Sequence, residues 1–350
     1  MKTVMIDGKT VGKGYPPFII AEAGINHNGK VETAFEMIKV AKNAGADAIK
    51  FQTFKTEEFV GDPYLTYTYR SQGKEITESM FEMFKRYEFN RDKWFLIKKK
   101  CDEEGIMFLS TPQNRSDLDV LLEVGVPAIK VGSDDFTNLP LLRSYVETGL
   151  PLIVSCGMSD LSEVHNALEV IGFFQEYPTI LMLCTSEYPT PPESVNLLKL
   201  RTLSHAFPGI VLGFSDHTLG PLASALAVSL GACVFEKHLT LNRDLPGPDH
   251  WFSEEPEGLK EWANSIRRAF IMLGKAEVRP TKAEMEMRLL ARRSIIALKD
   301  LKKGETLTLE NTGLRRPGNG LPPGMLDKVI GMKATHDISK RTLLKMGDFR

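Results

Sequence analysis

The chain has 350 residues, of which 42% are hydrophobic and 25% are charged, and its formal net charge is −1. This composition allows a sizeable buried core and argues against a disordered chain. The balanced charge argues against a surface built to bind nucleic acid or an anionic membrane. The first residues lack the apolar centre of a signal peptide, and no apolar run approaches the roughly 18 residues of a membrane-spanning helix. The four cysteines form no CxxC pair, so we expect a cytoplasmic protein with reduced thiols and no membrane partner.

Short apolar runs alternate with longer helical segments along most of the chain. Eight runs have the length and character of buried strands: Phe18–Ala21, Ala48–Phe51, Met107–Ser110, Ala128–Val131, Leu152–Ser155, Ile180–Cys184, Ile210–Phe214 and Cys233–Glu236. Helical spacing follows each of them: Val31–Ala44, Arg91–Glu104, Ser116–Glu123, Leu139–Glu147, Leu161–Phe173, Val195–Ala206, Leu222–Leu230 and Leu259–Leu273. Near-continuous apolar strands are typical of a parallel sheet buried on both faces. Eight such units in about 270 residues predict an α/β fold, the (β/α)8 TIM barrel. A doubly wound open sheet is the alternative, but no GxGxxG or Walker A loop follows a strand.

The residue pattern of the sequence changes after Gly274. Thr281 and Glu284 have the spacing of a capping box and predict a short helix that reaches Ala291. The remaining residues form short alternating segments broken by Gly and Pro, which indicates a small β-rich domain. We therefore predict a barrel domain over residues 1–278, a linker helix over 279–291 and a small domain over 292–350.

Polar side chains follow every predicted strand. They are Glu22, Lys50 and Gln52, Ser110 and Thr111, Lys130 and Ser133, Ser155, Thr185 to Tyr188, Ser215 to His217, and Glu236 to His238. In a parallel barrel the carboxyl ends of the strands meet at one mouth, where catalytic residues lie. Single Ser, Thr or His residues at such positions are often only helix caps or satisfied polar groups. Polarity at one end of all eight strands is harder to explain in this way, and it favours an enzyme.

Two kinds of chemistry are present among these residues. Lys50 and Lys130, together with hydroxyl groups, suit a phosphate or carboxylate ligand, although both lysines could instead be structural ion-pair partners. His217 and His238 follow neighbouring strands and suit a catalytic divalent cation. Strand parity puts Ser215 and His217 on one face and puts Glu236 on the same face as His238. Lys237 has the opposite parity, so we interpret it as a structural ion-pair partner.

Several motifs then identify a known family. They are IIAEAGINHNG (Ile19–Gly29), IKFQ (Ile49–Gln52), STP (Ser110–Pro112), KVGS (Lys130–Ser133), CTSEYPTP (Cys184–Pro191), GFSDHT (Gly213–Thr218), EKHLT (Glu236–Thr240), PGPDH (Pro246–His250) and RRPGNG (Arg315–Gly320). In this order they resemble the N-acetylneuraminate (sialic acid) synthase family, which includes legionaminate and pseudaminate synthases. The resemblance implies a TIM barrel followed by an antifreeze-like (SAF) domain, in a domain-swapped homodimer.

The resemblance also implies roles for individual residues. Phosphoenolpyruvate would be held by six of them: Lys50, Thr111, Lys130, Ser133, Ser155 and Ser215. His217 and His238 would bind a divalent metal, with Mn²⁺ expected and Mg²⁺ or Co²⁺ as alternatives. Glu22 would act as the catalytic acid or base beside them. The sugar would contact Gln52, Tyr188 and Asp249, and also Arg316 from the other protomer.

The expected reaction condenses phosphoenolpyruvate with an open-chain N-acylated mannosamine-type sugar, giving N-acetylneuraminate or a close analogue and phosphate. Some sialic acid synthases have His-Cys-Thr-Asn where this chain has Leu183–Ser186, which leaves a legionaminate- or pseudaminate-type di-acetamido sugar open. A synthase of 3-deoxy-keto acid phosphates is a further alternative, and it would need a second phosphate site. A non-enzymatic carbohydrate- or ice-binding protein would leave the eight polar strand ends unexplained.

Overall fold

The computed structural model describes residues 2–350, which divide into two compact units, Met1–Gly274 and Lys275–Arg350. Among the described residues, none of the helices combines the length and the apolar character needed to span a bilayer.

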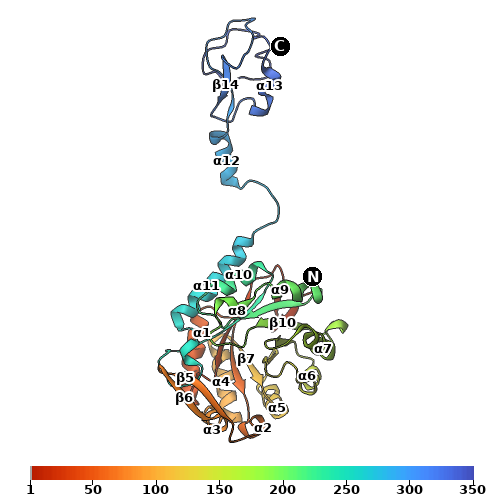
Figure 1. The fold of residues 1–350 in the computed structure, drawn as a ribbon, viewed down its shortest axis with the longest axis vertical. Helices are drawn as coiled ribbons and strands as arrows, with labels where there is room; N and C mark the ends of the chain where they lie inside the picture. Colours follow the sequence, from red (N-terminus) through yellow and green to blue (C-terminus); the bar gives the residue numbers. More distant parts are fainter. Residues whose placement is uncertain (1) are drawn as a thin grey trace. The chain divides into compact units, whose positions relative to one another are not determined.

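Eight parallel strands form the centre of the first unit (Figure 1). They are β3 (Phe18–Gly24), β4 (Ala48–Thr53), β7 (Met107–Pro112), β8 (Ile129–Val131), β9 (Leu152–Ser155), β10 (Thr179–Cys184), β11 (Val211–Ser215) and β12 (Val234–His238). Their order in the sheet is β7-β4-β3-β12-β11-β10-β9-β8. Because β7 also lies beside β8, the sheet curves round on itself. The predicted (β/α)8 barrel is therefore confirmed, with the strands one to three residues longer at some ends than the sequence indicated.

Helices surround the strands in the first unit (Figure 1). They are α1 (Val31–Asn43), α2 (Thr56–Phe59), α3 (Met80–Tyr87), α4 (Arg91–Glu104), α5 (Arg115–Val124), α6 (Leu139–Val146), α7 (Leu161–Ile171), α8 (Pro192–Val195), α9 (Lys199–Ala206), α10 (Leu222–Ser229) and α11 (Pro256–Leu273). Gly105 ends α4 in the left-handed conformation, with φ of 66°, which explains a glycine at that position.

Side chains of the strands alternate between two apolar cores. Ile19 and Ala21 of β3 point outward and pack with the helices. Phe18 and Ile20 point inward, and they pack with Val4 and Val11 of the amino-terminal hairpin. This hairpin consists of β1 (Val4–Ile6) and β2 (Lys9–Val11). Apolar side chains thus fill the amino-terminal end of the barrel, which leaves the carboxyl end for the polar ones.

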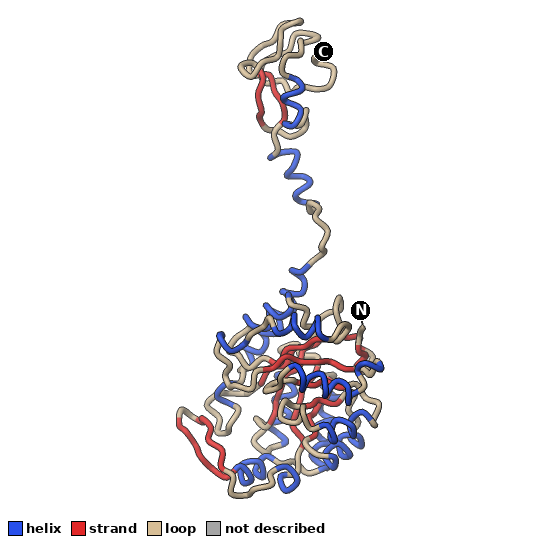
Figure 2. The backbone as a smooth tube through the Cα atoms, turned by 45° about the vertical axis from the view of Figure 1, so that its right-hand side comes forward, coloured by secondary structure: helices blue, strands red, loops and turns tan. Residues whose placement is uncertain are grey.

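A second hairpin, β5 (Thr66–Ser71) and β6 (Lys74–Ser79), lies between β4 and α4 together with α2 and α3. Figure 2 shows its two strands side by side at the lower left of the barrel. No helix or strand was predicted here from the sequence. The hairpin was overlooked because most of its residues are exposed on both faces, so the apolar alternation of a half-buried strand is missing.

The second unit begins after α11. Its helix α12 (Lys282–Ala291) starts with the predicted capping box, in which Thr281 and Glu284 bond each other's backbone N–H groups. Two antiparallel strands follow, β13 (Ser294–Ala297) and β14 (Thr312–Arg315), and then the short helix α13 (Leu326–Val329). Isolated bridges join further extended segments around a small apolar core. The unit is β-rich as predicted, although most of its pairing is too short to form regular strands.

Candidate active site

The carboxyl ends of β12, β3 and β4 bring three predicted site residues to one level of the barrel. His238 is paired in register with Glu22, and Glu22 is paired with Lys50. Two residues further along these strands, Gln52 of β4 is paired with Thr111 of β7. Residues that are far apart in the sequence therefore lie in one row across the barrel mouth.

Four charged side chains inside this mouth form one buried network. The Lys50 ammonium group lies 3.0 Å from Glu22 Oε1 and 3.6 Å from Glu236 Oε1. Lys130 lies 3.8 Å from the same Glu236 oxygen. All four side chains are at most 6% exposed, so solvent screens their charges little.

Hydroxyl groups complete the network. Lys50 donates to Thr111 Oγ1 at 3.2 Å and Lys130 donates to Ser155 Oγ at 2.8 Å. Ser215 donates to Glu236 Oε1 at 3.2 Å. Ser133 is outside these hydrogen bonds, and its hydroxyl oxygen accepts from the backbone N–H of Gly157 at 3.0 Å. Five of the six residues predicted to hold an anion thus belong to this network, and both lysines are also ion-paired.

Two carboxylate oxygens in this network have no partner. Glu22 Oε2 and Glu236 Oε2 are buried and accept no hydrogen bond. Burial raises the pKa of Glu22 to about 7, against the opposing charge of Lys50. Burial also opposes ionisation of Glu236, but the ammonium groups of Lys130 and Lys50 hold its pKa below the usual value. Glu22 is therefore the carboxyl group that can exchange a proton near neutral pH.

His217 and His238 lie beside this network, with their ring centroids 5.5 Å apart. His217 Nδ1 lies 2.8 Å from the backbone carbonyl of Thr185. Because a carbonyl only accepts, Nδ1 carries the hydrogen, and in the neutral imidazole Nε2 keeps its lone pair. The Nδ1 atom of His238 is buried without a partner. Burial lowers the pKa of His238 well below the usual value, so this imidazole is neutral, which is the form that binds metals.

The two imidazoles fit a catalytic divalent cation. In His217, the hydrogen bond from Nδ1 to a backbone carbonyl orients the ring, as is usual for metal-binding histidines. In His238, a buried ring nitrogen has no partner and is available to a cation. Within residues 2–350, no group of three or more His, Cys, Asp or Glu side chains is arranged to hold a metal. A cation here would therefore take its other ligands from water or substrate, as open catalytic sites do.

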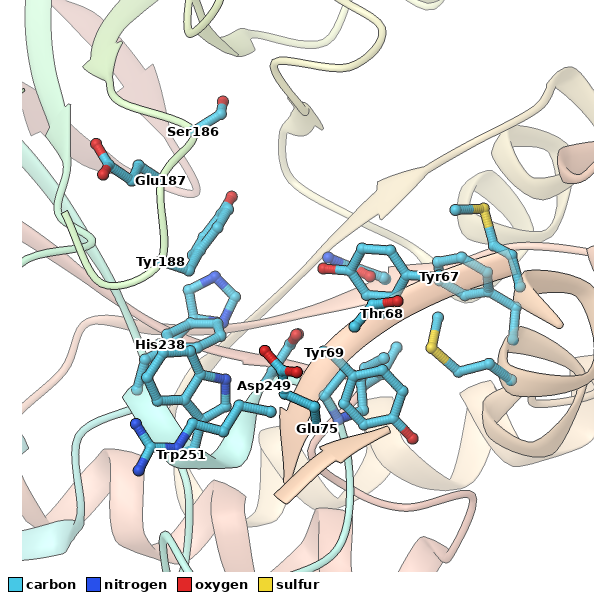
Figure 3. Close-up of a pocket in the computed structure, with 18 of the residues that line it drawn as sticks. Tyr67, Thr68, Tyr69, Glu75, Ser186, Glu187, Tyr188, His238, Asp249 and Trp251 are labelled. Carbon is cyan, nitrogen blue, oxygen red and sulfur yellow. The ribbon is translucent and has the colours of Figure 1, made fainter. Parts of the chain in front are cut away.

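A cavity of about 710 Å³ opens from His238 toward the surface. Gln52, Tyr188 and Asp249, the residues predicted to contact a sugar, all line it together with His238. In Figure 3, Asp249 lies between Tyr188 and His238 on one side and the β5–β6 hairpin on the other. The Tyr188 ring also packs on His217, with the centroids 4.2 Å apart. The volume is in the ordinary range of small-molecule sites.

Arg316 is the one predicted site residue that lies outside the first unit. It is exposed and directly follows β14 in the second unit. Its predicted contact with the sugar of another protomer stays a prediction.

Lys237 was predicted to be a structural ion-pair partner, and this is confirmed. Its ammonium group lies 3.2 Å from Asp216 Oδ2, and both side chains are nearly fully buried. The pair lies on the outer side of β11 and β12, where Ser224 of α10 and Trp262 of α11 also donate to Asp216.

Two parts of the site were not predicted from the sequence. Glu236 joins both lysines and was not proposed as a site residue, although its parity with His238 pointed to the barrel interior. The hairpin residues Tyr67, Thr68 and Tyr69 line the cavity and belong to a segment for which no element was predicted.

Known proteins resemble the chain over nearly its whole length. The sequence model of the NeuB family matches residues 37–278, and that of the SAF domain matches residues 292–350. N,N'-diacetyllegionaminic acid synthase of Legionella pneumophila is 39% identical over 96% of this chain and 95% of that protein. N-acetylneuraminate-9-phosphate synthase of Homo sapiens is 33% identical over 93% of this chain and 90% of that protein.

Solved structures agree with the fold. The crystal structure of N-acetylneuraminic acid synthetase from Leptospira borgpetersenii, in complex with citrate, has a TM-score of 0.73 and 32% identity, covering 82% of this chain and 95% of that one. The family match covers more than half of the chain, and several relatives exceed 30% identity over nearly all of it. The chain therefore belongs to the NeuB family and carries a carboxyl-terminal SAF domain.

Proposed function

We propose that the chain condenses phosphoenolpyruvate with an open-chain N-acylated mannosamine-type sugar, giving N-acetylneuraminate or a close analogue and phosphate. Its relatives are named as synthases of sialic-type acids. The observation that carries the proposal is the barrel mouth itself. Two buried lysines, a partnerless Glu22 oxygen and two imidazoles lie side by side there.

Phosphoenolpyruvate would bind to Lys50 and Lys130, with Thr111, Ser133, Ser155 and Ser215 around it. Its carboxylate and phosphate groups match ammonium and hydroxyl donors. Lys50 is paired with Glu22 and Glu236, and Lys130 is paired with Glu236. A bound anion would therefore compete with these carboxylates for the lysines, which makes the Glu22 carboxylate a stronger base.

In the first chemical step, the C2=C3 π bond of phosphoenolpyruvate would open and C3 would form a carbon–carbon bond to the aldehyde carbon of the sugar. The π bond of the aldehyde breaks, and its oxygen takes up a proton and becomes a hydroxyl group. Positive charge develops at C2 of the phosphoenolpyruvate unit, and a water molecule adds to that carbon. Glu22 Oε2 would take the proton from this water, because it is the buried carboxylate oxygen without a partner. The resulting tetrahedral intermediate expels phosphate by cleavage of its C2–O bond, and the lysines neutralise the departing charge.

His217 and His238 would hold a divalent cation, with Mn²⁺ expected and Mg²⁺ or Co²⁺ as alternatives. When bound, the cation supplies Lewis-acid polarisation of the aldehyde oxygen. Gln52, Tyr188 and Asp249 would orient the sugar so that its aldehyde faces C3 of phosphoenolpyruvate, and such positioning accounts for much of the rate in two-substrate reactions.

Two N-acylated sugars are candidates for the second substrate. N-acetylmannosamine is one, and a di-acetamido trideoxy hexose is the other, as the name of the Legionella pneumophila relative implies for that protein. We also propose a cytoplasmic homodimer that exchanges its SAF domains, in which Arg316 of the partner subunit contacts the sugar.

Phosphate release from phosphoenolpyruvate tests the proposal directly. The purified chain would be assayed with a panel of free amino sugars, with and without Mn²⁺. We expect release that needs both an N-acylated mannosamine-type sugar and a divalent cation. Release with tetrose or pentose phosphates in place of amino sugars would contradict the proposal and favour a synthase of 3-deoxy-keto acid phosphates.

A further inference from the structure

Strand β3 ends in a tight turn just beyond Glu22. The backbone N–H of Asn26 donates to the Ala23 carbonyl at 2.9 Å, and Gly24 between them has a φ of 51°. This left-handed conformation favours glycine. The pairing of β3 with β4 also shifts its register between Glu22 and Gly24. The chain therefore changes direction directly after the predicted acid or base.

Three predicted site residues converge on the turn at Gly24. A β carbon at this glycine would lie 3.4 Å from Glu22 Oε1, 3.6 Å from Asp249 Oδ2 and 3.8 Å from His238 Cε1. These are contact distances, so the three side chains surround the space above Gly24. They come from β3, from β12 and from the loop before the short helix His250–Phe252. Their arrangement thus depends on how these three parts of the chain are held together.

The Asn26 side chain joins the three parts. Its amide nitrogen donates to the backbone carbonyl of Leu239, the residue after His238, at 2.8 Å. It also donates to Ser253 Oγ at 3.0 Å, and the Ser253 hydroxyl donates to the backbone carbonyl of Asp249 at 2.5 Å. Asn26 is 1% exposed and Ser253 is fully buried. One amide group therefore ties the turn after β3 to the end of β12 and to Asp249.

Only the donor end of the Asn26 amide is paired. Its oxygen, Oδ1, is buried and has no hydrogen-bond partner among the described residues. An unpaired buried acceptor costs stability. An asparagine that served stability alone would be expected to pair both ends of its amide, so the two donated bonds are what this position requires.

Asn28, two residues further along, contacts the same loop. Its Oδ1 lies 3.2 Å from Nε2 of His250, the residue after Asp249. The other ring nitrogen of His250, Nδ1, lies 2.7 Å from Thr240 Oγ1. The buried His250 ring is therefore held between the turn after β3 and the end of β12, and these contacts add to those of Asn26.

We propose that Asn26 is a positioning residue that sets where His238 and Asp249 lie relative to Glu22. It does not line the cavity, and it acts through the two hydrogen bonds that its amide donates. The inference rests on the proposed function, in which His238 would hold the cation and Asp249 would contact the sugar. Asn26 makes no hydrogen bond to β4 or β8, which carry the two lysines, so the affinity for phosphoenolpyruvate should not depend on it.

Two variants test the inference by activity and metal binding. Asn26→Ala removes both donated bonds, and Ser253→Ala removes the link to Asp249. We expect both variants to lower kcat/KM for the N-acylated sugar, Asn26→Ala by about 10–100-fold, because small displacements of positioned groups cost rate. Asn26→Ala should also weaken Mn²⁺ binding about 10-fold, as measured by electron paramagnetic resonance. The calorimetric affinity for phosphoenolpyruvate should stay at the wild-type value. The double variant should be no worse than Asn26→Ala, because both residues act in one chain of bonds.

Hydrogen exchange of the full-length chain without ligands measures the positioning independently of activity. In Asn26→Ala, residues 239–253 should exchange about 10-fold faster, the effect of losing one or two buried hydrogen bonds, while residues 129–131 of β8 exchange as in the wild type. Thr179→Val is the matched control, because it removes a buried hydroxyl group at the amino-terminal end of β10. It should leave the exchange of residues 239–253, the Mn²⁺ affinity and kcat/KM unchanged.

Unchanged exchange of residues 239–253 in Asn26→Ala, or unchanged Mn²⁺ affinity together with normal kcat/KM for the sugar, would overturn the inference and leave the condensation reaction intact. An equal loss of affinity for phosphoenolpyruvate would overturn it as well, because a general loss is not positioning. If Asn26→Ala does not fold, Ser253→Ala decides by the same measurements. If the wild type releases no phosphate with any amino sugar, the proposed function fails, and hydrogen exchange and Mn²⁺ affinity still decide this inference.

Discussion

Two buried ion clusters lie on opposite sides of the same two strands, β11 and β12. The inner cluster joins Glu236 to Lys50 and Lys130, and Lys50 to Glu22, inside the barrel mouth. The outer cluster joins Asp216 to Lys237, between the strands and the helices. Because successive strand residues point to opposite faces, Glu236 and Lys237 are neighbours in sequence but belong to different clusters.

The clusters differ in how completely their polar atoms are satisfied. Asp216 accepts from Thr218 through Oδ1, and from Ser224 and Trp262 through Oδ2, in addition to its pair with Lys237. In the inner cluster, Glu22 and Glu236 each retain a buried oxygen without a partner. A fully satisfied cluster holds the structure together, whereas unpaired buried acceptors cost stability and are retained where a ligand or a reaction uses them.

The largest expected effect tests the inner cluster. Glu22→Gln should lower kcat by about 10²–10⁴-fold, because the amide cannot take a proton from water. The thermal unfolding midpoint should change little, since Lys50 keeps Glu236 as a partner. Binding of phosphoenolpyruvate, measured by calorimetry, should persist. A variant with near-normal kcat would remove Glu22 from the mechanism.

The second effect concerns the outer cluster. Asp216→Ala should reduce the free energy of unfolding by about 3–5 kcal/mol, because it leaves Lys237 buried and unpaired. The double variant Asp216→Ala/Lys237→Met should recover part of this loss, since the unpaired charge is gone. Denaturant unfolding followed by circular dichroism measures both. A loss below 1 kcal/mol in Asp216→Ala would show that the outer pair does not hold the strands together.

The third effect concerns the two imidazoles. His238→Ala should weaken Mn²⁺ binding more than about 100-fold, since loss of a direct ligand exceeds loss of an outer partner. Electron paramagnetic resonance of free Mn²⁺ measures this affinity independently of any activity assay. His205→Ala, an exposed histidine on α9, is the matched control. Full activity of the wild type in excess chelator would contradict a role for the cation.

The smallest expected effect lies in the second unit. Arg316→Ala should lower kcat/KM about tenfold, the value of one charge-assisted hydrogen bond of about 1.5 kcal/mol. Arg293→Ala changes another exposed arginine of the same unit and should have no effect. Wild-type activity in a chain cut near residue 285 would contradict the proposed contribution of Arg316.

Much of the fold could be predicted from the sequence. Eight apolar runs predicted eight strands, and parity predicted that Lys237 lies outside the barrel. The hairpin β5–β6 could not be predicted from apolar alternation, because most of its residues are exposed and contacts with the loop near Asp244 and Gly247 help to hold it. The role of Glu236 was missed for a related reason, since its partners belong to β4 and β8.

The sequence by itself determined which side chains stand at the strand ends and on which face of each strand, because side-chain direction in a strand follows position along the chain. Only the tertiary structure decided which of them meet. Closure of the sheet puts β12 beside β3, so that His238 and Glu22 become register partners although they come from opposite ends of the first unit. Ion pairing depends on such distances, and a linear sequence does not contain the curvature and register that set them.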